Sequence, residues 1–292
     1  MDNLIAKADT LLEALPYMQR FRGETFVIKY GGSFMDSTDS AVRSGVARDV
    51  VFIEAVGINP VIVHGGGKAI TRALEQAGVE TRFEQGYRVT TPKSVEVVEQ
   101  VLSREINSGI VGMINELGGK ARGFSGTEIF RCKPFRPLGQ AGEPLDIGLV
   151  GEVTGVNTAP LLECIAQDIT PVISPTATGE NGQVYNCNAD VAAGQAAVAL
   201  RPKRLVYMSD VPGLLQNPDD PASVISHLPV AEVEALKAGG VISKGMIPKV
   251  DSAVTAVAAG VEKVFFIDGR LSHSLLLEIF TDAGVGTEIV KR

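Results

Sequence analysis

The apolar residues of this chain fall into short runs separated by longer stripes with helical spacing. Residues 25–30 read TFVIKY, and their β-branched and aromatic side chains favour a buried strand. Similar runs predict strands at 60–64, 170–174, 183–186, 204–208, 262–267 and 287–290. Between them, apolar positions three or four residues apart predict helices at about 39–57, 67–77, 92–117, 189–200, 229–238, 246–259 and 273–281. This alternation indicates the α/β class, with a mainly parallel central sheet between two layers of helices.

The first twenty residues carry an amphipathic pattern of their own. Apolar side chains follow helical spacing at Leu4, Ile5, Ala8, Leu11, Leu12 and Leu15. Pro16 is expected to end or kink this helix, because a proline inside a helix removes a hydrogen bond. The apolar stripe either packs on its own domain, which the pattern alone favours, or forms an arm that contacts another subunit.

Residues 119–156 are richer in glycine and proline than the neighbouring segments. Alternating stretches such as TEIFRCKP and GLVGEV predict β-hairpins inserted beside the main sheet. A boundary near 178–185 is expected to divide the chain into two lobes that share one continuous sheet. At the start of the second predicted helix, Asp39 or Ser40 is expected to be the N-cap.

Composition narrows the class of protein. The chain has 292 residues, of which 45% are hydrophobic, enough for one large or two modest domains. A net charge of −7 argues against nucleic acid or an anionic membrane as a partner. Cys132, Cys164 and Cys187 form no CxxC pair, which predicts reduced thiols in a cytoplasmic protein. The first residues do not resemble a secretory signal, and no apolar run is long enough to span a membrane.

Candidate chemistry begins at the ends of the first two predicted strands. Lys29 and the pair Gly31-Gly32 end the first strand, and Gly65-Gly66-Gly67 ends the second. Glycine lets bare backbone N–H groups approach a phosphate closely, and a following helix adds the positive end of its dipole. The segment HGGGKAIT at 64–71 does not match the Walker pattern, and no well-placed GxGxxG follows a strand. These turns therefore predict a phosphate site of another kind, although simple strand-ending turns remain the alternative.

Four further segments carry polar residues at the ends of predicted elements. The guanidinium group of Arg88 is suited to binding a carboxylate, and the alternative is that Arg88 is an ordinary surface charge. Asn186, Asn188 and Asp190 either orient a ligand or, through Asn188, cap a helix. Asp210 and Gly213 form a turn that suits a nucleotide, or an ordinary surface turn.

Lys249 lies in the first turn of a predicted helix, where the positive end of the helix dipole is unfavourable for a cation. This position indicates an anion bound nearby. The three histidines are His64, His227 and His273, and they form neither a triad nor a metal-ligand cluster in the sequence. His64 is expected to be structural.

Six motifs, taken in order, resemble the amino acid kinase family. They are KYGG at 29–32, VHGGG at 63–67, GYRVT at 86–90, YNCNAD at 185–190, SDVPGLL at 209–215 and GMIPKV at 245–250. Each motif is weak alone, but the ordered set covers nearly the whole chain. Within the family the chain is similar to the N-acetylglutamate kinases of arginine biosynthesis, and its N-terminal helix resembles that of their arginine-sensitive, hexameric subset.

The resemblance implies the amino acid kinase fold and transfer of phosphate from ATP, with Mg²⁺, to the γ-carboxylate of N-acetyl-L-glutamate. It implies an interaction helix at 1–20, an N-terminal lobe at 21–180 with the N-acetylglutamate site and the dimer interface, and an ATP-binding lobe at 181–292. It also implies a hexamer built as a trimer of dimers, with feedback inhibition by L-arginine. A nitrogen-signalling protein is a candidate partner of that ring.

The resemblance also implies roles for single residues. Lys29 and Lys249 would stabilise the transferring phosphoryl group, and Asp190 would orient both lysines. Backbone amides of Gly31, Gly32 and Gly65 would hold phosphate oxygens, and Asp210 and Gly213 would contact the nucleotide. The predicted N-acetylglutamate contacts are Gly66, Gly67, Arg88, Asn186 and Asn188, with Arg88 on the α-carboxylate. The candidates for an arginine site are Tyr17, His273 and Glu278.

The expected chemistry needs few groups. A side-chain carboxylate is ionised at pH 7, so the nucleophile requires no general base. The sequence contains no evident carboxylate cage, so Mg²⁺ is expected to arrive on the ATP phosphates. Two departures from the family pattern are Cys187, where a branched aliphatic residue is usual, and Lys244, where glycine is common. Two alternatives stay open: a sister kinase acting on another carboxylate or a carbamate, and a non-catalytic hexamer that senses arginine or nucleotide.

Overall fold

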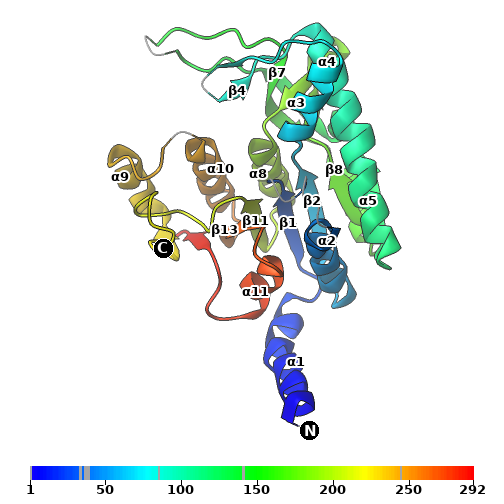
Figure 1. The fold of residues 1–292 in the computed structure, drawn as a ribbon, viewed down its shortest axis with the longest axis vertical. Coiled ribbons are helices and arrows are strands. Elements are labelled where there is room, and N and C mark those ends of the chain that lie inside the picture. The colour runs from blue at the N-terminus through cyan, green and yellow to red at the C-terminus, as the bar shows by residue number, and fades with distance from the viewer. Residues whose placement is uncertain (1, 33–34, 36–39, 85, 140–141, 244) are drawn as a thin grey trace.

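An eight-stranded, mainly parallel sheet runs through the middle of the protein (Figure 1). The computed structural model describes residues 2–32, 35, 40–84, 86–139, 142–243 and 245–292. The pair β13–β14 is antiparallel and the other pairings in the sheet are parallel. In spatial order the strands are β12 (His227–Pro229), β14 (Thr287–Val290), β13 (Lys263–Asp268), β11 (Arg204–Ser209), β1 (Thr25–Tyr30), β2 (Asn59–His64), β8 (Thr170–Ile173) and β5 (Ala121–Phe124).

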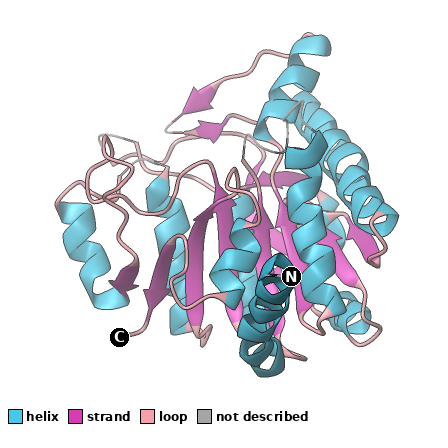
Figure 2. Ribbon diagram, turned by 60° about the horizontal axis from the view of Figure 1, so that its bottom comes forward, coloured by secondary structure: helices cyan, strands magenta, loops and turns pink. Residues whose placement is uncertain are grey.

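Helices cover both faces of this sheet, which confirms the predicted three-layer α/β architecture (Figure 2). One face packs against α2 (Ser40–Ala55), α5 (Asn107–Glu116) and α11 (Ser274–Phe280). The other packs against α8 (Ala189–Leu200) and α10 (Met246–Ala258). Because side chains alternate along a strand, Lys29 follows Val27 onto the α8–α10 face, whereas His64 follows Ile62 onto the α2–α5 face.

A small closed barrel stands beside the main sheet. Its strands are β6 (Phe130–Pro134), β7 (Val150–Val156), β9 (Thr176–Thr178) and β10 (Val184–Cys187). The antiparallel pair β6–β7 confirms the predicted hairpin, but two assignments were wrong. Residues 121–124 form the edge strand of the main sheet, and the predicted strand at 183–186 belongs to the barrel. Both strands are only four residues long, so their local pattern does not tell one sheet from the other.

The predicted helix at 92–117 is correct in extent but not in type. It consists of α4 (Pro92–Glu99), a π-helix η2 (Gln100–Ile106) and α5. The wider turn of the π segment shifts the inward face, so that Val98 and Leu102 are followed by Asn107 and Ile110. Asn107 is thereby placed in the interior.

The N-terminal helix α1 (Asp2–Phe21) extends away from the rest of the protein (Figure 1). Pro16 lies inside this helix and does not end it, because the exposed helix lets water reach the carbonyl group that loses its partner. The favoured expectation that the apolar stripe packs on its own domain was wrong. Leu11 and Leu12 are 63% and 64% exposed, and among the described side chains of α1 those at its base, such as Tyr17 and Met18, pack against the core.

The remaining elements connect these layers. They are α3 (Gly67–Gln76), the hairpin β3 (Phe83–Glu84) and β4 (Tyr87–Arg88), α6 (Gly126–Ile129), α7 (Ala159–Ile165), η3 (Glu180–Gly182), η4 (Val230–Glu232) and α9 (Val233–Ala238). The short strand β12 was not predicted. Among the described residues, no helix has the length and apolar character needed to cross a membrane.

Candidate active site

Asp190 lies between two lysines at the carboxyl end of the sheet. Its Oδ1 is 3.0 Å from Lys29 Nζ, and its Oδ2 is 2.5 Å from Lys249 Nζ. Lys29 comes from β1, Asp190 from the first turn of α8, and Lys249 from the first turn of α10. The structure therefore brings together the three predicted catalytic residues from segments far apart in the sequence.

The charges of this cluster are strongly coupled. Burial alone would raise the pKa of Asp190, but the Lys29 and Lys249 ammonium groups outweigh it and lower that pKa to about 2. Burial, and then the neighbouring Lys29 charge, lower the pKa of Lys249, although Asp190 opposes this change. One buried carboxylate thus balances two buried cations, leaving a net positive charge for an anionic ligand.

Packing between α8 and α10 fixes the distance between Asp190 and Lys249. Ser252 on α10 and Tyr207 on β11 both donate to the backbone oxygen of Asp190, at 3.2 Å each. Gly194 allows the two helices to approach, because a Cβ there would lie 1.8 Å from Ser252 Oγ. Asn188 caps α8 by accepting from the N–H groups of Asp190 and Val191. The capping role considered for Asn188 is therefore real.

The two glycine turns border Lys29 directly. A Cβ on Gly31 would lie 2.7 Å from Lys29 Nζ, so this position must stay free for the ammonium group. Gly32 has a φ of 152°, in a region that favours glycine. The N–H of Gly65 donates to Tyr30 O at 2.7 Å and is already satisfied, unlike the free phosphate donor that was expected.

Arg88 lies beneath the second glycine turn and is buried rather than on the surface. Its guanidinium donates to Gly67 O and Thr71 Oγ1, at 3.0 Å and 2.8 Å, and stacks on the Phe83 ring. Burial lowers the pKa of Arg88, and no carboxylate pairs with it among the described residues. A buried cation without a counter-ion is suited to an anionic ligand.

The cleft beside this cluster has two parts, and Asp190 and Lys249 lie next to it without lining either part. The smaller part, about 290 Å³, is lined by Lys29, both glycine turns, Arg88, Asn186 and Asn188. The larger part, about 900 Å³, lies between α8, α10 and the Tyr87–Phe135 ring pair. Gly86, Tyr87, Val150 and Asn188 line both parts, so the smaller space adjoins the larger one.

Comparison with known proteins identifies the family. The model of the amino acid kinase family matches residues 24–268, which include every residue that lines this cleft. The chain belongs to the amino acid kinase family. As a kinase of this family it is a transferase that uses ATP.

Curated relatives in the amino acid kinase family are similar over almost the whole chain. An acetylglutamate kinase of Akkermansia muciniphila is 49% identical over 99% of this chain and 97% of its own length. An acetylglutamate kinase of Carboxydothermus hydrogenoformans is 46% identical over 98% of this chain and 99% of its own length.

Solved structures of other proteins share the fold of this chain. An N-acetylglutamate synthase from Neisseria gonorrhoeae, solved with coenzyme A and N-acetyl-glutamate, has a TM-score of 0.83 at 24% identity. It covers 98% of this chain, while this chain spans 63% of that longer one. A carbamate kinase from Giardia has a TM-score of 0.66 at 15% identity, with 92% of this chain and 99% of that chain covered.

The two predicted nucleotide contacts of this amino acid kinase do not line the cleft. Asp210 and Gly213 follow β11 but line neither part of it. The pKa of Arg270, which follows the adjacent strand β13, is raised mainly by its hydrogen bond to Asp268 and to a smaller extent by the charge of Asp210. Gly213 packs on β14, where a Cβ would lie 2.6 Å from Thr287 Oγ1.

The three candidates for an arginine site do not share one cavity. Tyr17 and Glu278 line a cavity of about 310 Å³ at the base of α1. His273 instead contacts Asp49 Oδ1 at 2.7 Å and lines a separate space of about 130 Å³.

Of the two departures from the family pattern, Cys187 is buried in the barrel and lines the smaller part of the cleft. Lys244 and Asp39 lie outside the described residues. All three cysteines are unpaired thiols in the structure, as predicted from their spacing.

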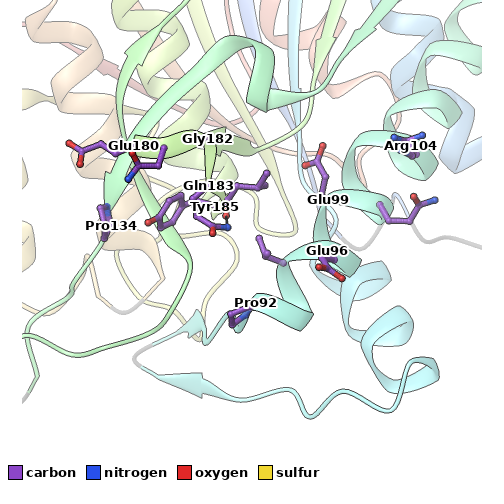
Figure 3. Close-up of a pocket in the computed structure, with 13 residues that line it drawn as sticks. Pro92, Glu96, Glu99, Arg104, Pro134, Glu180, Gly182, Gln183 and Tyr185 are labelled. Atoms are coloured by element: carbon purple, nitrogen blue, oxygen red, sulfur yellow. Dashed lines mark hydrogen bonds between the residues drawn. The ribbon is translucent and has the colours of Figure 1, made fainter.

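A third cavity, of about 900 Å³, contains none of the predicted site residues (Figure 3). Glu96, Glu99 and Arg104 approach it from the α4–η2 helix, and Glu180 and Tyr185 from the barrel side. It has the same volume as the larger part of the cleft, so volume alone does not distinguish the two spaces.

Four residues that organise the site were not predicted: Thr71, Gly194, Tyr207 and Ser252. They act through contacts between elements, so no short motif marks them. The signal available in the sequence was a small residue on each of two neighbouring helices, Gly194 and Ser252, which permits close packing.

Proposed function

We propose that this kinase transfers the γ-phosphoryl group of ATP to the γ-carboxylate of N-acetyl-L-glutamate, giving an acyl phosphate and ADP. The observation that carries the proposal is the Lys29–Asp190–Lys249 cluster next to Arg88, whose guanidinium has no carboxylate partner among the described residues. The relatives named acetylglutamate kinase support this choice of substrate.

Arg88 positions the acceptor. Its buried fork binds the α-carboxylate, and the side chain of the substrate then extends across the smaller part of the cleft toward Lys29. The reacting carboxylate is already ionised near pH 7. The cleft therefore has to orient the nucleophile but does not have to deprotonate it.

The positive charges of Lys29 and Lys249 reduce the repulsion between the anionic carboxylate and the anionic γ-phosphate, which is the main barrier to the reaction. Asp190 holds both ammonium groups in place before the reaction, so little reorganisation is needed as charge moves. Loss of one such preorganised charge is expected to lower kcat on the order of 10²–10³-fold.

Magnesium enters this proposal as part of the substrate MgATP. Both oxygens of Asp190 face lysines, so this carboxylate is not available as a metal ligand. No group of three or more His, Cys, Asp or Glu side chains suited to a metal ion occurs among the described residues. The phosphates and water therefore supply the ligands of the ion.

The test is an ADP-release assay with three variants. Lys29→Ala and Lys249→Ala should remain folded and lose nearly all turnover, whereas Lys120→Ala, which removes an exposed lysine outside the cleft, should not. N-acetylglutamate should be preferred over glutamate, aspartate and carbamate. Equal turnover of an unacetylated acceptor would favour a sister kinase, and no ADP release with any acceptor would favour the non-catalytic alternative.

Feedback inhibition by L-arginine is a second proposal, and the cavity at the base of α1 supports it. Arg20, Arg204 and Lys263 line this cavity and could bind a carboxylate. Opposite charges come from the acidic residues Glu278, Asp282 and Glu288, which suit a guanidinium. Inhibition by arginine but not by the uncharged analogue citrulline is expected, and equal rates with both would exclude this regulation.

The exposed stripe of α1 supports the proposed hexamer. Ile5, Leu11 and Leu12 are more than half exposed, and apolar side chains in such a row favour burial against another subunit. Light scattering of the full chain should give six subunits. The double variant Leu11→Glu, Leu12→Glu should give a smaller species that retains kinase activity, whereas an unchanged mass would contradict a role of α1 in assembly.

A further inference from the structure

His64 lies beneath the second glycine turn, at the end of β2, with its side chain fully buried. Its Nδ1 is 2.9 Å from Gly65 O, and its Nε2 is 3.3 Å from Asn107 Nδ2. Asn107 directly follows the π-helix, and it is also buried. The ring thus connects the glycine turn to the unusual segment of the long helix.

The hydrogen-bond partners define the protonation of this ring. Asn107 Nδ2 also lies 2.9 Å from Val172 O, so the amide nitrogen faces acceptors and must be the donor. His64 Nε2 therefore accepts from Asn107, and Nδ1–H donates to Gly65 O. Burial lowers the pKa of His64 to about 4, which keeps the ring neutral at pH 7.

The bond to Gly65 O sets the direction of the next N–H group. In a trans peptide the C=O and the following N–H point in opposite directions. Because the Gly65 carbonyl is directed at the buried ring, the Gly66 N–H is directed away from it, toward the cleft that Gly66 lines. No acceptor for this N–H is present among the described residues.

The π-helix also supports the turn from the side. A Cβ on Gly66 would lie 2.4 Å from Ile106 Cδ1 and 2.8 Å from Leu102 Cδ2, so the chain passes directly over these side chains. The turn lies close to the reacting cations as well. The position of a Cβ on Gly31 is 2.7 Å from Lys29 Nζ and 3.5 Å from Gly65 N.

We propose that His64, held by Asn107, is a positioning residue that fixes the Gly65–Gly66 peptide plane so that the Gly66 N–H donates to the oxygens that gain charge during phosphoryl transfer. The proposed kinase reaction supplies the kinetic readout, so this inference rests on that function. His64 itself does not contact substrate and stays neutral throughout. A donor that acts on charge developing in the transition state contributes to kcat more than to KM.

Two substitutions separate this role from simple packing. In His64→Asn the side-chain amide nitrogen can take the place of Nδ1 and keep the bond to Gly65 O. In His64→Gln the amide reaches the place of Nε2 and meets Asn107, but the bond to Gly65 O is lost. Both variants remove the ring and should lose stability, so their thermal midpoints serve as the control for packing.

The expected result is a split between the two variants. Relative to His64→Asn, His64→Gln should lower kcat on the order of 10–10²-fold, with the KM for ATP little changed. Equal kcat in the two variants, whether both high or both low, would overturn the positioning role.

A measurement on the unmodified protein keeps the inference testable if a variant fails to fold. Amide hydrogen exchange at Gly66 should be rapid in the free protein and slow with N-acetylglutamate, ADP and aluminium fluoride bound. Protection that is already complete in the free protein would overturn the inference. If the wild-type protein has no turnover with N-acetylglutamate, the proposed function fails instead.

Discussion

Asp190→Asn tests the electrostatic account of the site in quantitative terms. The substitution keeps the shape of the side chain but removes the only negative charge between Lys29 and Lys249 in the described cluster. The pKa of Asp190 falls from its ordinary value of 3.8 to about 2. This lowering of the pKa corresponds to about 2 kcal/mol of stability that depends on the ionised carboxylate.

The variant should lose more than this amount, because two buried ammonium groups are left without a counter-ion. Breaking a buried ion pair typically costs about 3–5 kcal/mol, so the expected loss in unfolding free energy is about 2–5 kcal/mol at pH 7. Glu234→Gln is the control, since it removes an ion pair on an 82% exposed carboxylate and should cost less than about 1 kcal/mol.

Urea unfolding at fixed protein concentration measures both variants. Because the folded pKa of Asp190 is lowered, its stabilisation is complete above pH 4 and disappears as the pH falls through about 2. The difference between wild type and Asp190→Asn should therefore be constant from pH 8 to pH 5. A difference below about 0.5 kcal/mol at pH 7 would refute the reasoning that this carboxylate holds the two lysines.

Three further predictions concern single residues. Gly31→Ala places a methyl group 2.7 Å from Lys29 Nζ and should lower kcat on the order of 10²-fold, while Gly45→Ala, with open space around its Cβ, should not; equal kcat in both would contradict the steric argument. Arg88→Met should raise the KM for N-acetylglutamate by about 30-fold or more without a matching change in the KM for ATP, in contrast to Arg82→Met at an exposed ion pair. Tyr17→Phe removes the hydrogen bond to Asp282 and should weaken inhibition by arginine while the uninhibited rate stays the same, as an arginine titration would show.

The parts of the fold that were predictable are those with a local signal. Residues 25–30 form a buried strand, and the side chains after Thr25 are apolar except Lys29. This apolar run is visible in the sequence. The glycines after this strand and after His64 mark turns for an equally local reason. The order of the six motifs then indicated the family, and the resemblance to that family predicted Asp190 and Lys249 as the partners of Lys29.

The parts that were not predictable depend on contacts between elements. Residues 121–124 and 184–187 are both only four residues long and show no clear alternation of buried and exposed positions. Only their pairing partners decide that the first joins the main sheet and the second joins the barrel. The π-helical segment Gln100–Ile106 packs against Gly66 through Leu102 and Ile106, a contact between elements that no local motif marks. Its trace in the sequence is a slip in the apolar stripe, which places the polar Asn107 where an apolar residue would be expected.

The same distinction applies to the site. The motifs and charges of the sequence predicted Lys29, Asp190 and Lys249. The hydrogen bond from the Gly65 N–H to Tyr30 O is visible only in the structure. The sequence also does not show that His273 lies apart from Tyr17. His273 contacts Asp49 of α2, and no motif marks this contact.

The central claim is that this protein phosphorylates the γ-carboxylate of N-acetyl-L-glutamate. The most direct test incubates the purified protein with ATP, Mg²⁺ and N-acetylglutamate and traps the product with hydroxylamine, which converts an acyl phosphate to a hydroxamate. The account predicts the hydroxamate of N-acetylglutamate in amounts equal to the ADP released, and its loss in Lys29→Ala. ADP release without hydroxamate, or hydroxamate formed equally well from glutamate, would contradict it.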